Sequence, residues 1–157
     1  SGVLSNQEAY RAIDWPVIVL LAAMIPVGQA LETTGGAELI ASWMLMLGSG
    51  GEAWVVVTIV LMGTMLLSNV VNNAAAAILV APIALSLSGQ LGIAADAMLM
   101  TVAIGASCAF LTPVGHQSNA LVMEPGGYRF GDYWRLGLPL SLLVALVAVP
   151  VILAVWG

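Results

Sequence analysis

The sequence predicts an all-α membrane protein. Of its 157 residues, 61% are hydrophobic and 7% are charged, whereas a soluble domain usually carries about 25% charged residues. With so few charges the chain cannot cover a water-facing surface, and its apolar residues form runs of helical length. Polar residues interrupt two of these runs. The interruptions predict a re-entrant helical hairpin and a discontinuous helix in addition to ordinary spanning helices.

Charge and cysteine content exclude several classes of protein. The net charge is −5, and the three basic residues give no patch that would bind nucleic acid. Cys108 is the only cysteine, so the chain has neither a disulfide framework nor a cysteine-rich metal site. The sequence holds no Ser/His/Asp arrangement and no pair of carboxylates suited to catalysis. We therefore expect neither an enzyme nor a bound organic cofactor.

The first part of the chain predicts a loop, a span and a surface helix. Residues 1–14 are polar and lack the apolar core of a signal peptide, so we expect a cytoplasmic loop within a longer protein, of which this chain is a fragment. Residues 15–34 form a linking transmembrane helix whose apolar part reaches about 25 Å. The sequence "ETTGG" then ends this apolar run. Residues 35–49 contain a run too short to cross a bilayer, which favours an interfacial arm helix.

Polar residues then interrupt an apolar stretch at "LLSNVVNNAAAA", residues 66–77. The apolar runs before and after this segment each reach about 22 Å, against a hydrocarbon core of about 30 Å. Together they are too long for a single crossing, although one long span with a polar defect is an alternative. We therefore expect residues 53–88 to form a re-entrant hairpin with "SNVVNN" at its turn.

The second interruption is "TPVGHQSN", within residues 97–123. Pro113 lacks an N–H and Gly115 is flexible, so backbone carbonyls there can leave the helical hydrogen-bond ladder. This pattern predicts a discontinuous transmembrane helix. A polar turn with aromatic residues suited to the headgroup region follows, and residues 136–156 form the final transmembrane helix.

The three arginines predict the orientation. If Arg11 is cytoplasmic, the expected crossings place Arg129 and Arg135 on the same side, in agreement with the positive-inside rule. We therefore expect a multi-pass protein of the cell inner (plasma) membrane whose C-terminus lies outside.

Together the two interruptions predict a site for small ions. Non-helical backbone at membrane depth is tolerated where protein or a water-filled cavity satisfies it, and short interrupted segments point to transporter sites. Freed carbonyls with Ser, Thr and Asn oxygens are hard ligands suited to Na⁺. The helix that begins near Ala74 directs its first N–H groups into the break, which attracts an anion. The alternative is that these polar residues only hydrogen-bond a neighbouring helix.

His116 is the only histidine in the chain. Two roles fit its position: a proton carrier or substrate contact, and a hydrogen-bonded loop residue. No Asp or Glu lies deep within an apolar run, which disfavours proton coupling.

At "SNVVNNAAAAILVAPIA" and "TPVGHQSNALV" the chain resembles the divalent anion/sodium symporter (DASS) family of the ion transporter superfamily, especially its prokaryotic sodium–sulfate and sodium–dicarboxylate permeases. "EAYRAIDWPVIVLLAAMIPVGQALETTG" and "GGYRFGDYWRLGLPL" are also typical of that branch. The resemblance implies the second inverted repeat of an elevator-type transporter. The first repeat, with the other half of the substrate site, would belong to the missing N-terminal half of the same transporter, and the resemblance also implies a homodimer.

The family carries a Ser-Asn-Thr motif at the turn of its hairpin. Asn73 is followed directly by "AAAAILVAP", which aligns the motif with residues 72–74; the frame "SNV" at residues 68–70 is the alternative. In either frame the Thr is replaced, while Thr112 and Pro113 match the family's Thr-Pro motif. The resemblance implies substrate contacts at Asn72, Asn73, Ala74, Thr112, Pro113 and Asn119, and Na⁺ ligands at Ser68, Asn73, Leu111 and Thr112.

The sequence therefore predicts the C-terminal transport half of a secondary active, Na⁺-coupled symporter for an anion of the sulfate or carboxylate class. Its partners would be the small anion, Na⁺ as the coupling ion and the lipid bilayer. The alternatives are a proton-coupled transporter or antiporter of the same superfamily, and a membrane sensor or assembly module that transports nothing.

Overall fold

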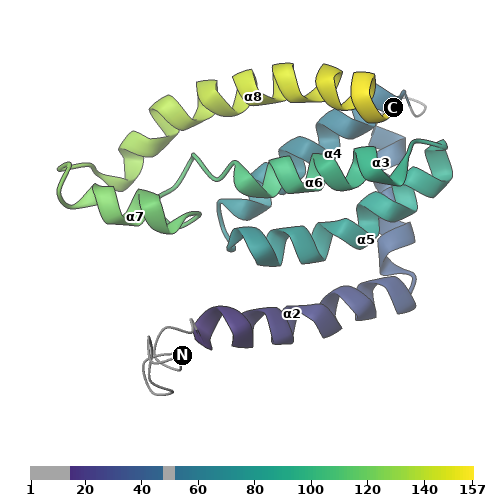
Figure 1. The fold of residues 1–157 in the computed structure, drawn as a ribbon, viewed down its shortest axis with the longest axis horizontal. Helices are drawn as coiled ribbons and strands as arrows, with labels where there is room; N and C mark the ends of the chain where they lie inside the picture. Colours follow the sequence, from purple (N-terminus) through teal and green to yellow (C-terminus); the bar gives the residue numbers. More distant parts are fainter. Residues whose placement is uncertain (1–14, 48–51) are drawn as a thin grey trace, which may run out of the picture.

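The computed structural model describes residues 15–47 and 52–157, and all regular structure within these residues is helical (Figure 1). The all-α prediction is therefore confirmed. The predicted loop at residues 1–14, with Arg11, lies outside the described residues, as do residues 48–49 of the predicted arm helix. The helices are α2 (Trp15–Thr33), α3 (Gly36–Leu47), α4 (Ala53–Ser68), α5 (Asn73–Leu91), α6 (Ala95–Ser107), α7 (Gln117–Met123) and α8 (Tyr133–Trp156), with a 3₁₀ turn η1 (Phe130–Asp132) before α8.

α2 and α3 form a sharp corner that packs on α5 (Figure 1). The end of α2 is satisfied locally, because the Thr34 hydroxyl donates to the Ala30 carbonyl at 2.6 Å. Gly35 then adopts φ 74°, a left-handed conformation that turns the chain and that glycine adopts without steric cost. The sequence "ETTGG" thus ends one helix and allows the next to start in a new direction.

α4 and α5 form a helical hairpin joined by residues 69–72. α5 begins where it does because the Asn72 side chain caps the helix, accepting a 2.7 Å hydrogen bond from Ala75 N. The helix continues to Leu91 and ends at Gly92, whose φ is 69°. The hairpin is thus longer than residues 53–88, and its re-entrant placement in a bilayer stays a prediction.

α6 packs against both α4 and α5, and the chain between α6 and α7 is not helical. We call this segment, residues 108–116, the break. α6 ends at Ser107 although apolar residues continue to Leu111. The reason is a tertiary contact, because the Asn69 side chain accepts from the N–H groups of Leu111 and Thr112, which a continuing helix would use internally.

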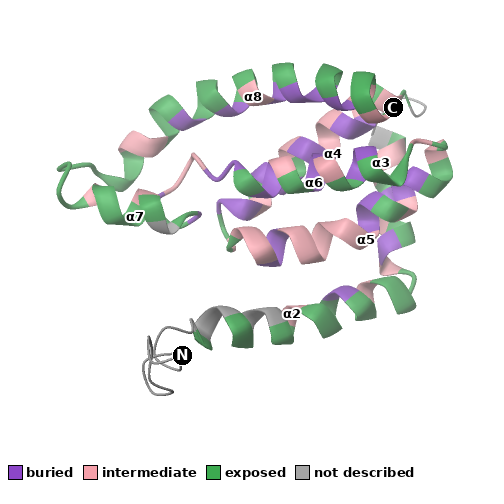
Figure 2. Ribbon diagram, viewed as in Figure 1, coloured by how far each residue is buried: buried purple, intermediate pink, exposed green. Residues whose placement is uncertain are grey.

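α8 lies along α4 and α6 with small residues facing them. Its buried positions include Gly137, Ser141, Ala145 and Ala148, while most of its leucines are exposed. Figure 2 shows the buried positions along one side of α8 and the exposed positions along the other. Small residues let helices approach closely where both neighbours are apolar. Within the described part of the chain, two helical stretches are long and apolar enough to cross a membrane: Asn73–Leu91 and Phe130–Trp156.

The core lies where α4 crosses α6. Val57, Val60 and Leu61 of α4 have no exposed surface, and neither does Met98 of α6. A Cβ at Gly105 would lie 2.8 Å from the Thr64 Cβ and 2.9 Å from the Leu61 carbonyl oxygen, so only glycine permits this crossing. This close contact fixes α6, and therefore the start of the break, against the hairpin.

We expect Gly105→Ala to destabilise the protein, because the added methyl would collide with α4 backbone as well as with Thr64. Overpacking of this kind costs about 1–3 kcal/mol. The measurement is the thermal unfolding midpoint of the purified full-length protein in detergent.

Gly63→Ala is the matched control, since Gly63 lies in α4 with nothing within 4 Å of the added Cβ. Alanine favours a helix over glycine by about 1 kcal/mol, so this midpoint should stay level or rise. Equal midpoints for both variants would show that the crossing is looser than the structure indicates.

Candidate functional site

The turn of the hairpin and the break lie against each other. We call residues 68–73 the tip. Gly115 of the break is buried against it, because a Cβ there would lie 2.6 Å from the Ala109 Cβ and 2.9 Å from the Ser68 carbonyl oxygen. The two polar interruptions, which are far apart in the sequence, therefore form one site.

The side chain of Asn73 lies among oxygens from three segments. We assign its amide with Nδ2 inward, because Oδ1 in that position would face only acceptors. Nδ2 then lies 2.8 Å from Ser68 Oγ, 3.1 Å from the Ala106 carbonyl oxygen and 3.1 Å from the Gly115 carbonyl oxygen. The Ser68 hydroxyl, which is fully buried, donates to the Ala106 carbonyl at 2.6 Å. The end of α6, the break and the tip thus meet at one amide.

Asn69 joins the tip to the break on the other side. Its Oδ1 accepts from Leu111 N at 2.8 Å and from Thr112 N at 3.2 Å, while its own carbonyl accepts from the Thr112 hydroxyl at 2.8 Å. Its Nδ2 donates to the Met65 carbonyl at 2.7 Å. The family resemblance placed Leu111 and Thr112 in the Na⁺ set, whereas Asn69 entered only through the alternative motif frame at residues 68–70 and was assigned no contact. One signal could have pointed to Asn69: backbone N–H groups that leave a helix at a break need other acceptors.

Asn119 holds the break from the side of α7. Its Nδ2 donates to the Ala109 carbonyl at 2.9 Å and to the Thr112 carbonyl at 3.1 Å. The Tyr133 hydroxyl, at the start of α8, donates to the Asn119 carbonyl at 2.7 Å. Both amide hydrogens of Asn119 are therefore used within the fold, which indicates that this side chain positions the break.

The remaining predicted residues have simpler surroundings. Asn72 is exposed and caps α5, Ala74 is half-buried in the first turn of α5, and Pro113 is buried in the break. His116 is exposed and caps α7, because its Nδ1 accepts from Ser118 N at 3.1 Å. The predicted Na⁺ residues Ser68 and Asn73 thus meet directly, Leu111 and Thr112 join them through Asn69, and the His116 ring has a local role.

The site contains no permanently charged side chain. Neither the tip nor the break contains Asp, Glu, Lys or Arg. Within the described residues no group of three or more His, Cys, Asp or Glu side chains could hold a metal ion. Any ion bound here would interact with neutral oxygens and peptide N–H groups.

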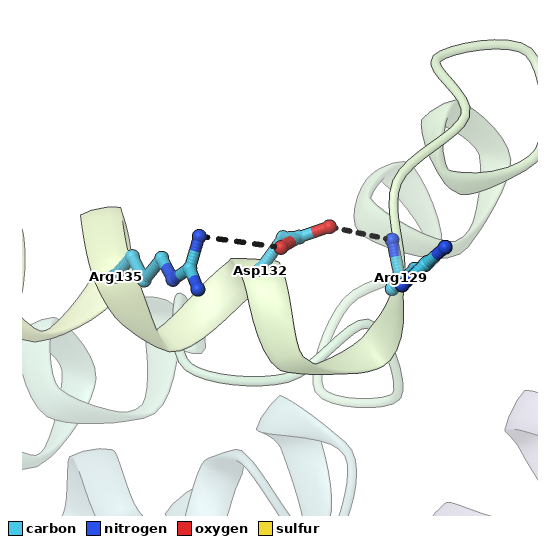
Figure 3. Close-up of polar contacts among 3 residues, drawn as sticks. All are labelled: Arg129, Asp132 and Arg135. Atoms are coloured by element: carbon cyan, nitrogen blue, oxygen red, sulfur yellow. Dashed lines mark hydrogen bonds and ion pairs between the residues drawn. The ribbon is translucent and has the colours of Figure 1, made fainter.

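A cavity of about 300 Å³ lies on the α8 side of the break. Its residues come from the break, α7, the following turn and α8: Phe110, Asn119, Tyr128, Asp132, Tyr133, Leu136, Gly137 and Leu140. Nearby, Asp132 lies between two arginines (Figure 3), accepting from Arg129 N at 2.9 Å and lying 3.9 Å from the Arg135 guanidinium. The two arginines of the described residues thus lie at or just before the start of α8, outside the tip and the break.

A neutral polar crossing point inside an apolar helical protein is the structure expected of a membrane transporter. The comparison of sequences agrees with this class. Residues 1–157 match the family described as citrate transporter, so the chain belongs to this family of membrane transporters in the ion transporter superfamily. The prediction that the chain is not an enzyme is confirmed with it.

Several relatives are named as transporters. An uncharacterized transporter of Synechocystis is 36% identical over 100% of this chain, and one of Escherichia coli is 36% identical over 95%. Sodium/sulfate cotransporter 1 of Chlamydomonas reinhardtii is 30% identical over 94% of the chain. The chain spans 26%, 24% and 17% of the length of these three relatives. It therefore corresponds to one part of a longer transporter.

We expect Asn119→Leu to loosen the break, because leucine has similar size and leaves the Ala109 and Thr112 carbonyls without their donor. Each buried carbonyl left unpaired costs about 1–3 kcal/mol. Hydrogen exchange of the full-length protein should show faster exchange across residues 108–116. Ser118→Ala, at an exposed neighbouring hydroxyl, should leave exchange unchanged. Identical exchange in the two variants would contradict the positioning role of Asn119.

Proposed function

We propose that the chain is the C-terminal transport half of a Na⁺-coupled symporter for an anion of the sulfate or carboxylate class, with the ion site where the tip meets the break. The observation that carries this proposal is the convergence of Ser68 Oγ and the Ala106 and Gly115 carbonyls on the Asn73 amide. Oxygens from three separate segments point to one position without any acidic residue.

The Asn73 amide can face these oxygens in two ways. With Nδ2 inward, the amide donates hydrogen bonds to these oxygens. With Oδ1 inward it becomes a further oxygen in the cluster, and a cation among them offsets their mutual repulsion. Carbonyl, amide and hydroxyl oxygens are the hard ligands that coupling cations use in broken-helix transporters. A turn of this one amide would therefore exchange a hydrogen-bonded cluster for a Na⁺ site.

The anion would bind at the start of α5, beside the cation. Asn72 accepts from the N–H groups of Ala75 and Ala76, which leaves those of Asn73 and Ala74 for a ligand. Helix N-termini attract anions through such groups and through the helix dipole. Because the tip and break lack Lys and Arg, bound Na⁺ would supply the positive charge that makes anion binding favourable.

The names of the relatives support the choice of ions. Three Chlamydomonas reinhardtii relatives are named as sodium/sulfate cotransporters, one of them as a probable one, and the family is described as citrate transporter. We extend this to Na⁺ coupling and to sulfate or citrate as the first anions to test. The exposed, capping position of His116 gives no support to proton coupling.

The proposal includes the placement in the membrane. The α4–α5 hairpin would be re-entrant, α3 would lie in the interface, and Arg129 and Arg135 would face the cytoplasm of a cell with this protein in its inner (plasma) membrane. The N-terminal half of the same transporter would contribute an inverted repeat and the second half of the anion site. Transport would follow an elevator-like alternating-access motion in a homodimer.

The test is uptake of labelled sulfate or citrate by the full-length protein in proteoliposomes. An inward Na⁺ gradient should accelerate uptake, and Asn73→Ala should reduce the Na⁺-driven part about 10-fold or more, since hydrogen bonds and ligands to charged groups contribute about 1.5–3 kcal/mol. Gln90→Ala, exposed near the end of α5, is the matched control and should transport normally.

Unchanged Na⁺ dependence in Asn73→Ala would show that the site assignment is wrong. Uptake that follows a pH gradient and ignores Na⁺ would replace the proposal with proton coupling. If the full-length protein transports neither anion under any ion gradient, the result would favour the alternative of a sensor or assembly module.

A further inference from the structure

We infer that Asn69 is a positioning residue that orders the break when Na⁺ binds at the tip, and so couples Na⁺ binding to anion binding at the start of α5. This inference rests on the proposed function and extends it to a residue outside both predicted ligand sets. Asn69 is 5% exposed, and both ends of its amide have partners within the described residues.

The contacts of Asn69 are divided between two elements. Nδ2 donates to the Met65 carbonyl one turn back in α4, a contact typical of a helix end. Oδ1 and the backbone carbonyl instead reach the break, where they accept from Leu111 N, Thr112 N and the Thr112 hydroxyl. Asn69 therefore supplies three of the hydrogen bonds that connect the tip to the break.

Asn69 also follows directly after Ser68, whose hydroxyl is bonded to the Ala106 carbonyl at the end of α6. The tip is thus fastened to α6 through Ser68 and to the break through Asn69. If the tip moves, the N–H groups of Leu111 and Thr112 lose their acceptor, which is costly for buried backbone. Closure of the tip around a cation and ordering of the break therefore occur together, as two sites coupled by a common element require.

Two substitutions separate this coupling role from a simple helix-end role. Asn69→Asp keeps an acceptor for Leu111 N and Thr112 N but loses the donor to the Met65 carbonyl. Asn69→Ala loses both. Ser107→Ala is the matched control, because this exposed serine borders the break and its hydroxyl bonds only to the Ala103 carbonyl of its own helix.

The first readout is alkylation of Cys108 by N-ethylmaleimide in the full-length protein in detergent, located by peptide mass spectrometry. Cys108 starts the break and is 7% exposed, so its reaction reports opening of the break. In the unmodified protein NaCl should slow the reaction relative to choline chloride. Asn69→Ala should react about 10-fold faster and respond little to Na⁺, whereas Ser107→Ala should behave as the unmodified protein does. Asn69→Asp is compared in choline chloride alone, because it adds a charge, and there it should react as slowly as the unmodified protein.

The second readout is the KM for sulfate uptake at low and high Na⁺ concentration. It should fall with Na⁺ in the unmodified protein and in Ser107→Ala, and fall much less with Na⁺ in Asn69→Ala. A role limited to stabilising the end of α4 would lower the amount of folded protein without changing this dependence.

Several results would overturn the inference. One is that Asn69→Ala matches Ser107→Ala in both readouts. Another is that Asn69→Asp reacts as fast as Asn69→Ala in choline chloride, which would assign the effect to the Met65 contact. If the unmodified protein shows no Na⁺-dependent uptake, the proposed function fails, and the Na⁺-free alkylation rates still decide whether Asn69 closes the break. If Asn69→Ala does not fold, hydrogen exchange of the unmodified protein decides: fast exchange at Leu111 and Thr112 excludes the clamp, and slow exchange supports it.

Discussion

The structure depends on one constraint: every peptide group that leaves a helix inside an apolar protein needs another partner. The break between α6 and α7 frees several such groups. Asn69 accepts from Leu111 N and Thr112 N, and Asn119 donates to the Ala109 and Thr112 carbonyls. Two asparagines on opposite sides of the break thus replace the backbone hydrogen bonds that a helix would form. They can do so because an amide offers both donors and acceptors without a charge.

Glycines make these contacts sterically available. Gly105 brings α6 against α4, and Gly115 brings the break against the tip, where any Cβ would overlap Ala109 and approach the Ser68 carbonyl. Gly137 of α8 approaches the Phe110 carbonyl in the same way from the other side. The break is therefore confined by backbone on two sides, and confinement makes a non-helical segment rigid enough to present oxygens at fixed positions.

Much of the fold could be predicted from the sequence, because apolar runs and their polar or glycine interruptions are local signals. The all-α class follows from them, as does the interest in the polar residues of the tip. The choice of Ser68 and Asn73 as ion ligands came instead from the family resemblance. The end of α6 at Ser107 could not be predicted, because apolar residues continue to Leu111 and the helix is ended by a distant side chain. The role of Asn69 could not be predicted either, because it depends on contacts with residues that are distant in the sequence.

The absence of charge in the site gives a physical reason for coupling in the proposed mechanism. An anion at the first turn of α5 would meet only peptide dipoles, which offset part of the several kcal/mol that desolvating an ion costs. For a cation among the Ser68, Asn73, Ala106 and Gly115 oxygens, the neutral ligands would likewise offset only part of the desolvation cost. When both ions are present each offsets the other's missing charge, whereas a fixed lysine or aspartate would favour one ion alone. A neutral site therefore favours joint binding, and the asparagines fit this requirement because they fasten the tip to the break without adding a charge of their own.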